Sequence, residues 1–224
     1  MLKAGLLLLA LFIGLALLVQ LKKLQSFDEG IAQKIFKTRS KSKTQLMLFF
    51  TALGRQRGFI VMIFLLAFVP GFRTSVLLPA GIALGFVWVL AYLLKRLIKR
   101  PRPEGQRLVE ERDHSFPSYH ATCSSTLFCC VALGGSSLYP LLTGLFMAIS
   151  LVMAGMIGYS RIYLGIHYLS DVLGGWFLGT GFALILQWFL TVNSILYTLA
   201  ILDGQAQALV NRKLIKIMIS STDS

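Results

Sequence analysis

The sequence predicts an all-α integral membrane protein, a bundle of six transmembrane helices. Of its 224 residues 56% are hydrophobic and only 14% are charged, whereas about a quarter of the residues in soluble domains are charged. Uncharged runs of about 18 residues or more recur along the chain, and each is long enough to cross a bilayer as a helix. The 22 Lys and Arg residues, against 9 Asp and Glu, stand mostly between these runs.

The first uncharged run covers residues 4–21 and follows Lys3. A cleaved signal peptide is the alternative interpretation. It would require small residues at a cleavage site after the apolar run, where the sequence instead has Leu21-Lys22-Lys23. The sequence therefore favours a helix that is retained as a membrane anchor.

The second apolar stretch, residues 46–72, is interrupted by Arg55 and Arg57. Arginine within a membrane span is rare and usually functional. Two interpretations remain open. Either one span turns both arginines toward the protein interior, or residues 46–57 lie at the membrane interface and the span itself is short.

Residues 75–94 form a clean third span, and a polar loop to about Pro117 follows. Residues 121–160 then contain no charge, and as one helix they would measure about 60 Å, twice the hydrocarbon thickness. They predict two spans back to back. We place the break at residues 134–137, Gly-Gly-Ser-Ser, with Pro140 just beyond, because these residues favour a turn.

The last uncharged run, residues 172–202, supplies the sixth span, and residues 205–219 beyond it are expected to form an amphipathic interfacial helix. Within this span Gly175 and Gly179 are four apart, a spacing that lets helices pack closely. We expect one membrane domain over the whole chain: residues 1–224, with a core at about 75–190 and a tail at 191–224. If each helix crosses once, three polar segments share one membrane face: residues 24–45, 95–117 and 160–165.

On that face, His167 and Asp171 are four residues apart at the start of the sixth span. One helical turn separates them, so the carboxylate can hold an imidazole N–H, which fixes the free ring nitrogen and makes it more nucleophilic. A structural hydrogen bond at a helix start is the alternative. Arg161 is the one charged residue in the preceding turn, and its planar guanidinium can bind an anion at the same place. Its presence favours a catalytic role for the pair over a structural one.

A second cluster, Pro117-Ser118-Tyr119-His120, stands at the start of the fourth span. A helix N-terminus exposes unpaired N–H groups that suit an anionic oxygen, and Ser118 adds a hydroxyl donor. His120 stands where it could protonate a leaving group. The alternative is an N-cap serine beside an interfacial histidine. His114 has no partner pattern and is interpreted as a solvated residue.

A third cluster contains Lys95 and Arg102, seven apart and two helical turns if the third span continues, so that both cations could converge on one phosphate. Their neighbours are interpreted as a basic collar that meets anionic lipid headgroups: Arg96, Lys99 and Arg100. The sequence predicts no metal site, because no further ligand-rich cluster exists. The three cysteines are interpreted as small hydrophobic residues: Cys123, Cys129 and Cys130.

The three clusters read K-x6-R-P from Lys95, P-S-Y-H from Pro117 and S-R-x5-H-x3-D from Ser160. Together and in this order they resemble the three-part signature of the type 2 phosphatidic acid phosphatase superfamily. The resemblance covers residues 95–171 directly and implies a phosphatase core built from helices 3 to 6. It implies a metal-independent enzyme without a cofactor, acting on a lipid such as undecaprenyl pyrophosphate, phosphatidylglycerophosphate or phosphatidic acid.

The resemblance also implies a role for each motif residue. His167 attacks phosphorus and forms a phosphohistidine, Asp171 orients it, and His120 protonates the leaving oxygen and later activates water. The phosphoryl oxygens are held by a backbone N–H near Tyr119 and by four side chains: Lys95, Arg102, Ser118 and Arg161. The family usually has Gly where this chain has Tyr119, and Tyr resists the backbone angles that Gly permits.

The expected partners are the lipid phosphate substrate and anionic headgroups, with no nucleic acid and no obligate protein partner. Two alternatives to hydrolysis are phosphotransfer to another acceptor and a non-catalytic anion-binding or transport protein, which would place charges near the bilayer midplane. The resemblance places the active site outside the cytoplasm in a cell membrane. The charge pattern argues the reverse, because 17 of the 22 basic residues fall on the motif-bearing face.

Overall fold

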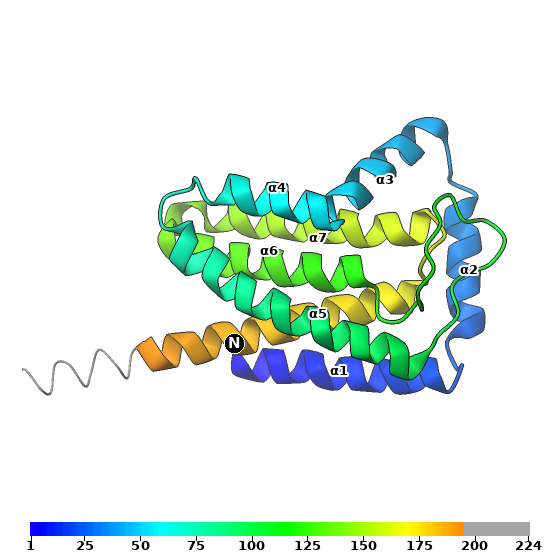
Figure 1. The fold of residues 1–224 in the computed structure, drawn as a ribbon, viewed down its shortest axis with the longest axis horizontal. Coiled ribbons are helices and arrows are strands. Elements are labelled where there is room, and N and C mark those ends of the chain that lie inside the picture. Colours follow the sequence, from blue (N-terminus) through cyan, green and yellow to red (C-terminus); the bar gives the residue numbers. More distant parts are fainter. Residues whose placement is uncertain (195–224) are drawn as a thin grey trace, which may run out of the picture. The chain divides into compact units, whose positions relative to one another are not determined.

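The computed structural model describes residues 1–194, which form helices and loops without a β-strand. Residues Met1–Leu186 form one compact unit, and the chain from Gln187 onward belongs to a second. The helices of the first unit (Figure 1) are α1 (Leu2–Gln20), α2 (Gln25–Phe36), α3 (Lys41–Leu53), α4 (Gln56–Leu66), α5 (Leu78–Ile98), α6 (Tyr119–Leu138) and α7 (Thr143–Tyr163). A last helix, Leu169–Ser194, follows α7. The amphipathic helix predicted at 205–219 lies outside the described residues.

The all-α membrane fold is confirmed. Within residues 1–194, five helical segments are long and apolar enough to cross a bilayer: Leu2–Gln20, Arg73–Ile98, Tyr119–Leu138, Pro140–Tyr163 and Leu169–Ser194. The second predicted span is instead a pair of helices, α3 and α4, bent by 70° at a short break. Counting this pair as one span gives the six that the uncharged runs predict.

Arg55 lies at the break between α3 and α4, Arg57 lies on the first turn of α4, and both side chains are exposed. The interpretation that turned them toward the protein interior is therefore wrong. A change of direction at this point keeps the guanidinium groups at a helix end rather than along a buried helix face, which avoids the cost of an unpaired buried charge.

The break between the fourth and fifth spans lies later than predicted. Helix α6 continues to Leu138, and the chain then turns through a short 3₁₀ segment, Pro140–Leu142, into α7. Gly134 is buried within α6, where a Cβ atom would stand 2.3 Å from the carbonyl oxygen of Ser75. The glycine therefore serves close packing rather than the turn.

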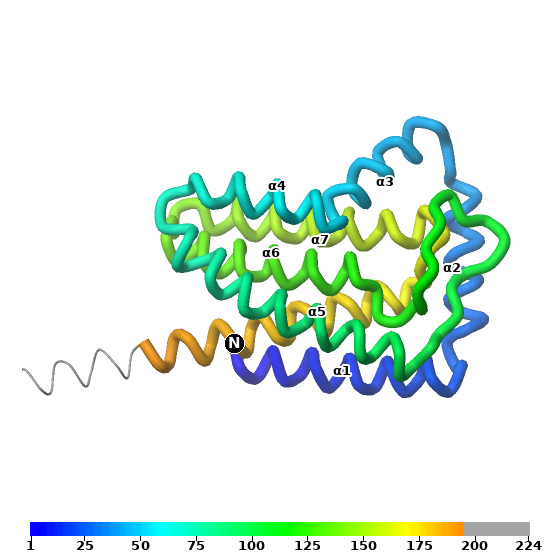
Figure 2. The backbone as a smooth tube through the Cα atoms, in the orientation of Figure 1, coloured from blue at the N-terminus to red at the C-terminus, as the bar shows by residue number. Residues whose placement is uncertain are grey.

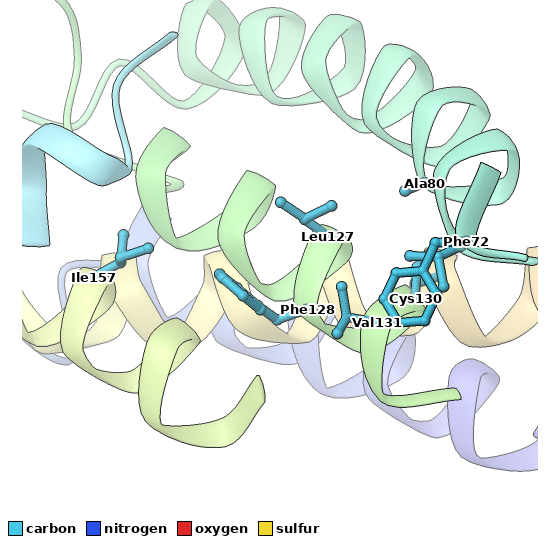
Figure 3. Packing of buried hydrophobic residues seen from close by; sticks show 9 residues of the cluster. Phe72, Ala80, Leu127, Phe128, Cys130, Val131 and Ile157 are labelled. Carbon is cyan, nitrogen blue, oxygen red and sulfur yellow. The ribbon is translucent and has the colours of Figure 1, made fainter. Parts of the chain in front are cut away.

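The main hydrophobic cluster lies among α5, α6 and α7 (Figure 3). Leu127 and Ile157 are fully buried in it, and Phe72 contributes from the segment before α5. Cys130 lies in the same cluster, and all three cysteines are free thiols, as expected for small hydrophobic residues. This packing fixes the directions of the three helices whose ends carry the motifs.

The polar segments meet at one end of the first unit, as predicted. Figures 1 and 2 show α2 and the loop between α5 and α6 together there, beside the end of α7. The backbone N–H of Leu108 in this loop donates to the carbonyl oxygen of Leu164 at 2.9 Å. Arg39, which follows α2, donates through Nη2 to the carbonyl oxygen of Tyr163 at 2.7 Å. The loop and α2 are thus fastened to the end of α7.

Gly179 brings the last helix against α6, because a Cβ atom there would stand 2.2 Å from the carbonyl oxygen of Thr122. We expect Gly179→Ala to lower the free energy of unfolding by about 1–3 kcal/mol, as other overpacked contacts do. Thermal unfolding in detergent would measure the change. Gly81→Ala in α5 is the matched control, since nothing lies within 4 Å of a Cβ there. Equal melting temperatures for the two variants would contradict the close-packing role.

Candidate active site

His167 lies in the turn between α7 and the last helix, and its side chain is 1% exposed. Its Nε2 is 3.2 Å from Nη1 of Arg102. Its Nδ1 is 3.5 Å from Oδ2 of Asp171 and 3.4 Å from Oγ of Ser115. Arginine has no acceptor atoms, so Nε2 must accept from Arg102 and the ring proton of neutral His167 sits on Nδ1. This tautomer leaves the lone pair of Nε2 as the nucleophile, as expected when a carboxylate holds the other ring N–H.

Asp171 is completely buried on the first turn of the last helix. The helix begins at Leu169, so the expectation that His167 also lies on that turn is wrong, and a turn holds the pair instead. Oδ2 of Asp171 accepts from Oγ of Ser115 at 2.5 Å and from the backbone N–H of Tyr168 at 2.8 Å. The carboxylate therefore has little freedom to move away from the imidazole.

Lys95 and Arg102 come together, but not by sharing a helix face. Helix α5 ends at Ile98, and Lys99 adopts the left-handed conformation with φ of 51°. Arg102 thus lies in the loop, where its Nη1 donates to the carbonyl oxygen of Ile166 at 2.8 Å. Both cations are buried, at 5% and 6% exposure, and both contact the carboxylate of Asp113, Lys95 at 2.8 Å.

Arg161 is 1% exposed near the end of α7. Its Nη1 donates to Oγ1 of Thr51 in α3 at 2.6 Å, and its Nη2 forms a 2.9 Å ion pair with Glu111. Each of the three cations predicted to bind phosphate is therefore paired with a carboxylate of the loop between α5 and α6. Carboxylate and phosphoryl oxygens bind the same donors, so the arrangement is that of an anion site.

Burial alone would raise the pKa of the Asp113 carboxyl, but the charges of Lys95 and Arg102 lower it from 3.8 to about 2. Because the folded pKa is the lower one, this pairing stabilises the folded protein above about pH 4 and is lost as the pH falls toward 2. Asp113 remains ionised at every pH at which a phosphatase would be assayed. A phosphoryl group bound by Lys95 and Arg102 would therefore compete with an ionised Asp113 throughout that range.

We therefore expect Asp113→Asn to lower KM for a lipid phosphate by about two- to fivefold. This factor corresponds to the free energy that a partly exposed ion pair contributes. Initial rates at several substrate concentrations would measure it. Asp113 is about half exposed, and its removal leaves Lys95 and Arg102 free to bind phosphate. Glu104→Gln, an exposed carboxylate of the same loop, is the control for net charge. A KM that rises in Asp113→Asn would contradict the competition.

Ser118 stands at the N-cap position of α6, but its fully buried side chain makes no capping hydrogen bond. Its hydroxyl has no hydrogen-bond partner among the described residues, and the same holds for Nε2 of His120, Nε of Arg161 and the hydroxyl of Tyr119. Buried polar atoms are usually paired, so four unpaired atoms on four predicted site residues indicate a place for a polar ligand.

A cavity of about 640 Å³ reaches His120 and Tyr119 from the break between α3 and α4. Its lining combines polar groups, such as Arg55 and Glu111, with apolar ones, such as Trp88. The ring of Tyr119 packs edge-on against Trp88, with 6.1 Å between centroids. The residue that departs from the family pattern thus contributes to the apolar wall of this cavity.

Arg100 was wrongly assigned to the basic collar. It is buried, and its guanidinium forms 2.7 Å ion pairs with Asp28 of α2 and with Asp171. Burial alone would lower its pKa, but the two carboxylates raise it above the ordinary value, so Arg100 stays charged. Arg96 and Lys99, in contrast, are exposed as a collar requires.

Sequence reasoning missed five residues that contact the site: Asp28, Thr51, Glu111, Ser115 and, in this role, Arg100. The run Arg100-Pro101-Arg102 was the one available signal, since Pro101 ends any helix before it. Throughout residues 1–194 no three of the His, Cys, Asp and Glu side chains gather as metal ligands would.

Residues 76–194 match the model of the PAP2 superfamily. The chain is similar to phosphatidylglycerophosphatase B of Bacillus subtilis (strain 168), with 31% identity over 173 residues, 75% of this chain and 85% of that protein. It is also similar to the undecaprenyl-diphosphatase of Sulfolobus acidocaldarius, with 30% identity over 145 residues, 60% of this chain and 65% of that protein.

The fold is similar to the crystal structure of a transmembrane PAP2-type phosphatidylglycerolphosphate phosphatase from Bacillus subtilis. The TM-score is 0.75 at 29% sequence identity, and the match covers 83% of this chain and 94% of that one. Sequence and fold comparisons thus point in the same direction as the three motifs.

Proposed function

The chain belongs to the PAP2 superfamily and is a multi-pass membrane lipid phosphatase, and on that premise we propose that it releases phosphate through a phosphohistidine on His167. The tautomer of this residue carries the proposal. Nδ1–H points to Asp171 and Ser115, and Nε2 presents its lone pair to the cations. A nucleophilic imidazole needs this arrangement beside a bound phosphoryl group.

In the first step Nε2 of His167 forms a bond to phosphorus, and the bond from phosphorus to the lipid oxygen breaks. His120 gives its proton to the departing oxygen, so the lipid leaves as an alcohol or, from a diphosphate, as a monophosphate. In the second step water attacks phosphorus, His120 takes a proton from it, and the N–P bond breaks. Inorganic phosphate is the second product, and both histidines return to their starting states.

The phosphoryl oxygens would be held by the groups that the resemblance implies: Lys95, Arg102, Arg161, Ser118 and the first N–H groups of α6. Phosphoryl transfer depends mostly on positioning and on stabilising charge on the equatorial oxygens. Three buried cations and an unpaired buried hydroxyl supply both. Neither of the two proposed reaction steps uses a metal ion or a cofactor.

We propose phosphatidylglycerophosphate or undecaprenyl pyrophosphate as the substrate, ahead of phosphatidic acid. The names of the similar bacterial and archaeal proteins support this choice. A cavity with a polar end at His120 and apolar walls suits a lipid whose tail stays in the bilayer.

The test is phosphate release by the purified protein in detergent with EDTA, measured on these three lipids at equal concentration. We expect undiminished activity in EDTA and the highest kcat/KM on one of the first two lipids. Loss of activity in EDTA would contradict the metal-free mechanism. A preference for phosphatidic acid would contradict the substrate proposal while leaving the mechanism intact.

We further propose that the site faces away from the cytoplasm and that residues 1–224 act as one phosphatase domain. With six crossings the C-terminus lies on the face opposite the motifs. A reporter fused there should therefore be cytoplasmic. An external reporter would place the motifs in the cytoplasm, where the bias of the basic residues would put them.

A further inference from the structure

Asp28 is the one acidic residue of α2 that is buried, with 0% exposure. It lies outside the part of the chain that matches the family model. Its Oδ1 accepts from the backbone N–H of Ser170 at 3.0 Å, and its Oδ2 accepts from Nη2 of Arg100 at 2.7 Å and from the hydroxyl of Ser170. A fully buried carboxylate with this many donors is held rigidly in one place.

Arg100 continues the network toward the nucleophile. Its Nη1 donates to Oδ1 of Asp171 at 2.7 Å and to Oγ of Ser170 at 2.6 Å. Its guanidinium also lies 4.4 Å from the ring centroid of Tyr168. One buried guanidinium therefore bridges two buried carboxylates, and one of these carboxylates faces His167.

We propose that Asp28 is a positioning residue for the reaction, acting on His167 through Arg100 and Asp171. The proposal rests on His167 being the nucleophile. Arg100 holds Oδ1 of Asp171 in place, but its charge would cancel that of Asp171. Asp28 offsets the charge of Arg100, so the three groups together carry −1 rather than zero behind the imidazole.

This negative charge matters because the imidazole becomes positive as the N–P bond forms. A carboxylate stabilises that charge, as it does in His-centred catalysis generally. The other charged groups that face His167 are mostly cations: Arg102, Lys95 and Arg161, with Asp113 opposing them. Burial and these cations already lower the pKa of His167 well below its ordinary value, and removing a negative charge would lower it further.

The test compares Asp28→Asn with Glu29→Gln, which removes a charge from the exposed neighbouring residue of the same helix. We expect Asp28→Asn to lower kcat about tenfold, the size of one charged hydrogen bond, with KM changed less than about twofold. The acid limb of the pH profile of kcat should move to lower pH. Glu29→Gln should change none of these quantities.

A double variant separates charge from simple loss of contacts. Asp28→Asn with Arg100→Gln restores the charge of −1 behind His167, so its kcat should exceed that of Asp28→Asn alone although more contacts are gone. Arg100→Gln alone should move the acid limb to higher pH. If Asp28→Asn does not fold, Arg100→Gln alone tests the proposal. An acid limb at the same pH as in the parent protein would then overturn it.

The proposal is also overturned if folded Asp28→Asn keeps the kcat of the parent protein, or if the double variant is no faster than Asp28→Asn alone. His167→Ala, measured beside them, keeps this result distinct from a failure of the proposed function. Activity retained in His167→Ala overturns both proposals. Activity lost there, with kcat unchanged in Asp28→Asn, overturns the positioning role alone.

Discussion

We expect His167→Ala to lower phosphate release roughly 10³-fold or more, because the variant lacks the atom that bonds to phosphorus. The effect should fall on kcat rather than on KM, since the three cations that hold the phosphoryl oxygens remain. Initial rates on the preferred lipid would measure both constants. The substitution removes a buried ring that contacts Arg102 and Asp171, so thermal unfolding of the variant is measured alongside.

His114→Ala is the matched control, because the side chain of His114 is exposed in the loop between α5 and α6. It should release phosphate at the rate of the parent protein. Rapid quenching with radiolabelled substrate adds a direct measurement, since a phosphohistidine is stable in base and labile in acid. Label should be retained by the parent protein and by His114→Ala. Labelling of His167→Ala at the same level would place the covalent step on another residue.

The spans could be predicted from the sequence because an uncharged run of about 20 residues has few alternatives to a membrane helix. The boundary near residue 138 could not be. Gly134 is compatible with a turn and with a tight helix contact, and only the position of Ser75 in the fold decides between them. The bend between α3 and α4 could not be predicted for a similar reason, since composition does not determine the direction of the Arg55 and Arg57 side chains.

Of the site, sequence could identify the residues whose chemistry is scarce in an apolar chain. Asp171 stands out with His167 because Arg161 is the only other charged residue of the sequence between Asp113 and Asp203. Arg100 could not be distinguished from its basic neighbours, because its direction depends on how α5 ends at Lys99. Asp28 contacts Arg100 across 72 positions of sequence, and no local pattern marks such a contact.

The second large effect concerns His120 and depends on the leaving group. We expect His120→Gln to lower kcat about 10²- to 10⁴-fold on a lipid phosphate, the range of general acid catalysis. The oxygen of a lipid alcohol must be protonated as it departs, whereas a nitrophenyl oxygen can leave as an anion. On a nitrophenyl phosphate ester, formation of the phosphohistidine should therefore be nearly as fast in the variant as in the parent protein.

His120 acts as a base in the second step of the proposed reaction, and this role predicts the kinetics of the variant on the nitrophenyl ester. Hydrolysis of the phosphohistidine needs a proton taken from water, so in His120→Gln the second step should become rate-limiting. Stopped-flow absorbance should then show a burst of about one nitrophenol per enzyme, followed by slow turnover, with phosphoenzyme accumulating. Nε2 of His120 is buried and unpaired among the described residues, as expected of a group that exchanges protons with the leaving oxygen and with water. An equal loss on both substrates, without a burst, would assign His120 to structure rather than to proton transfer.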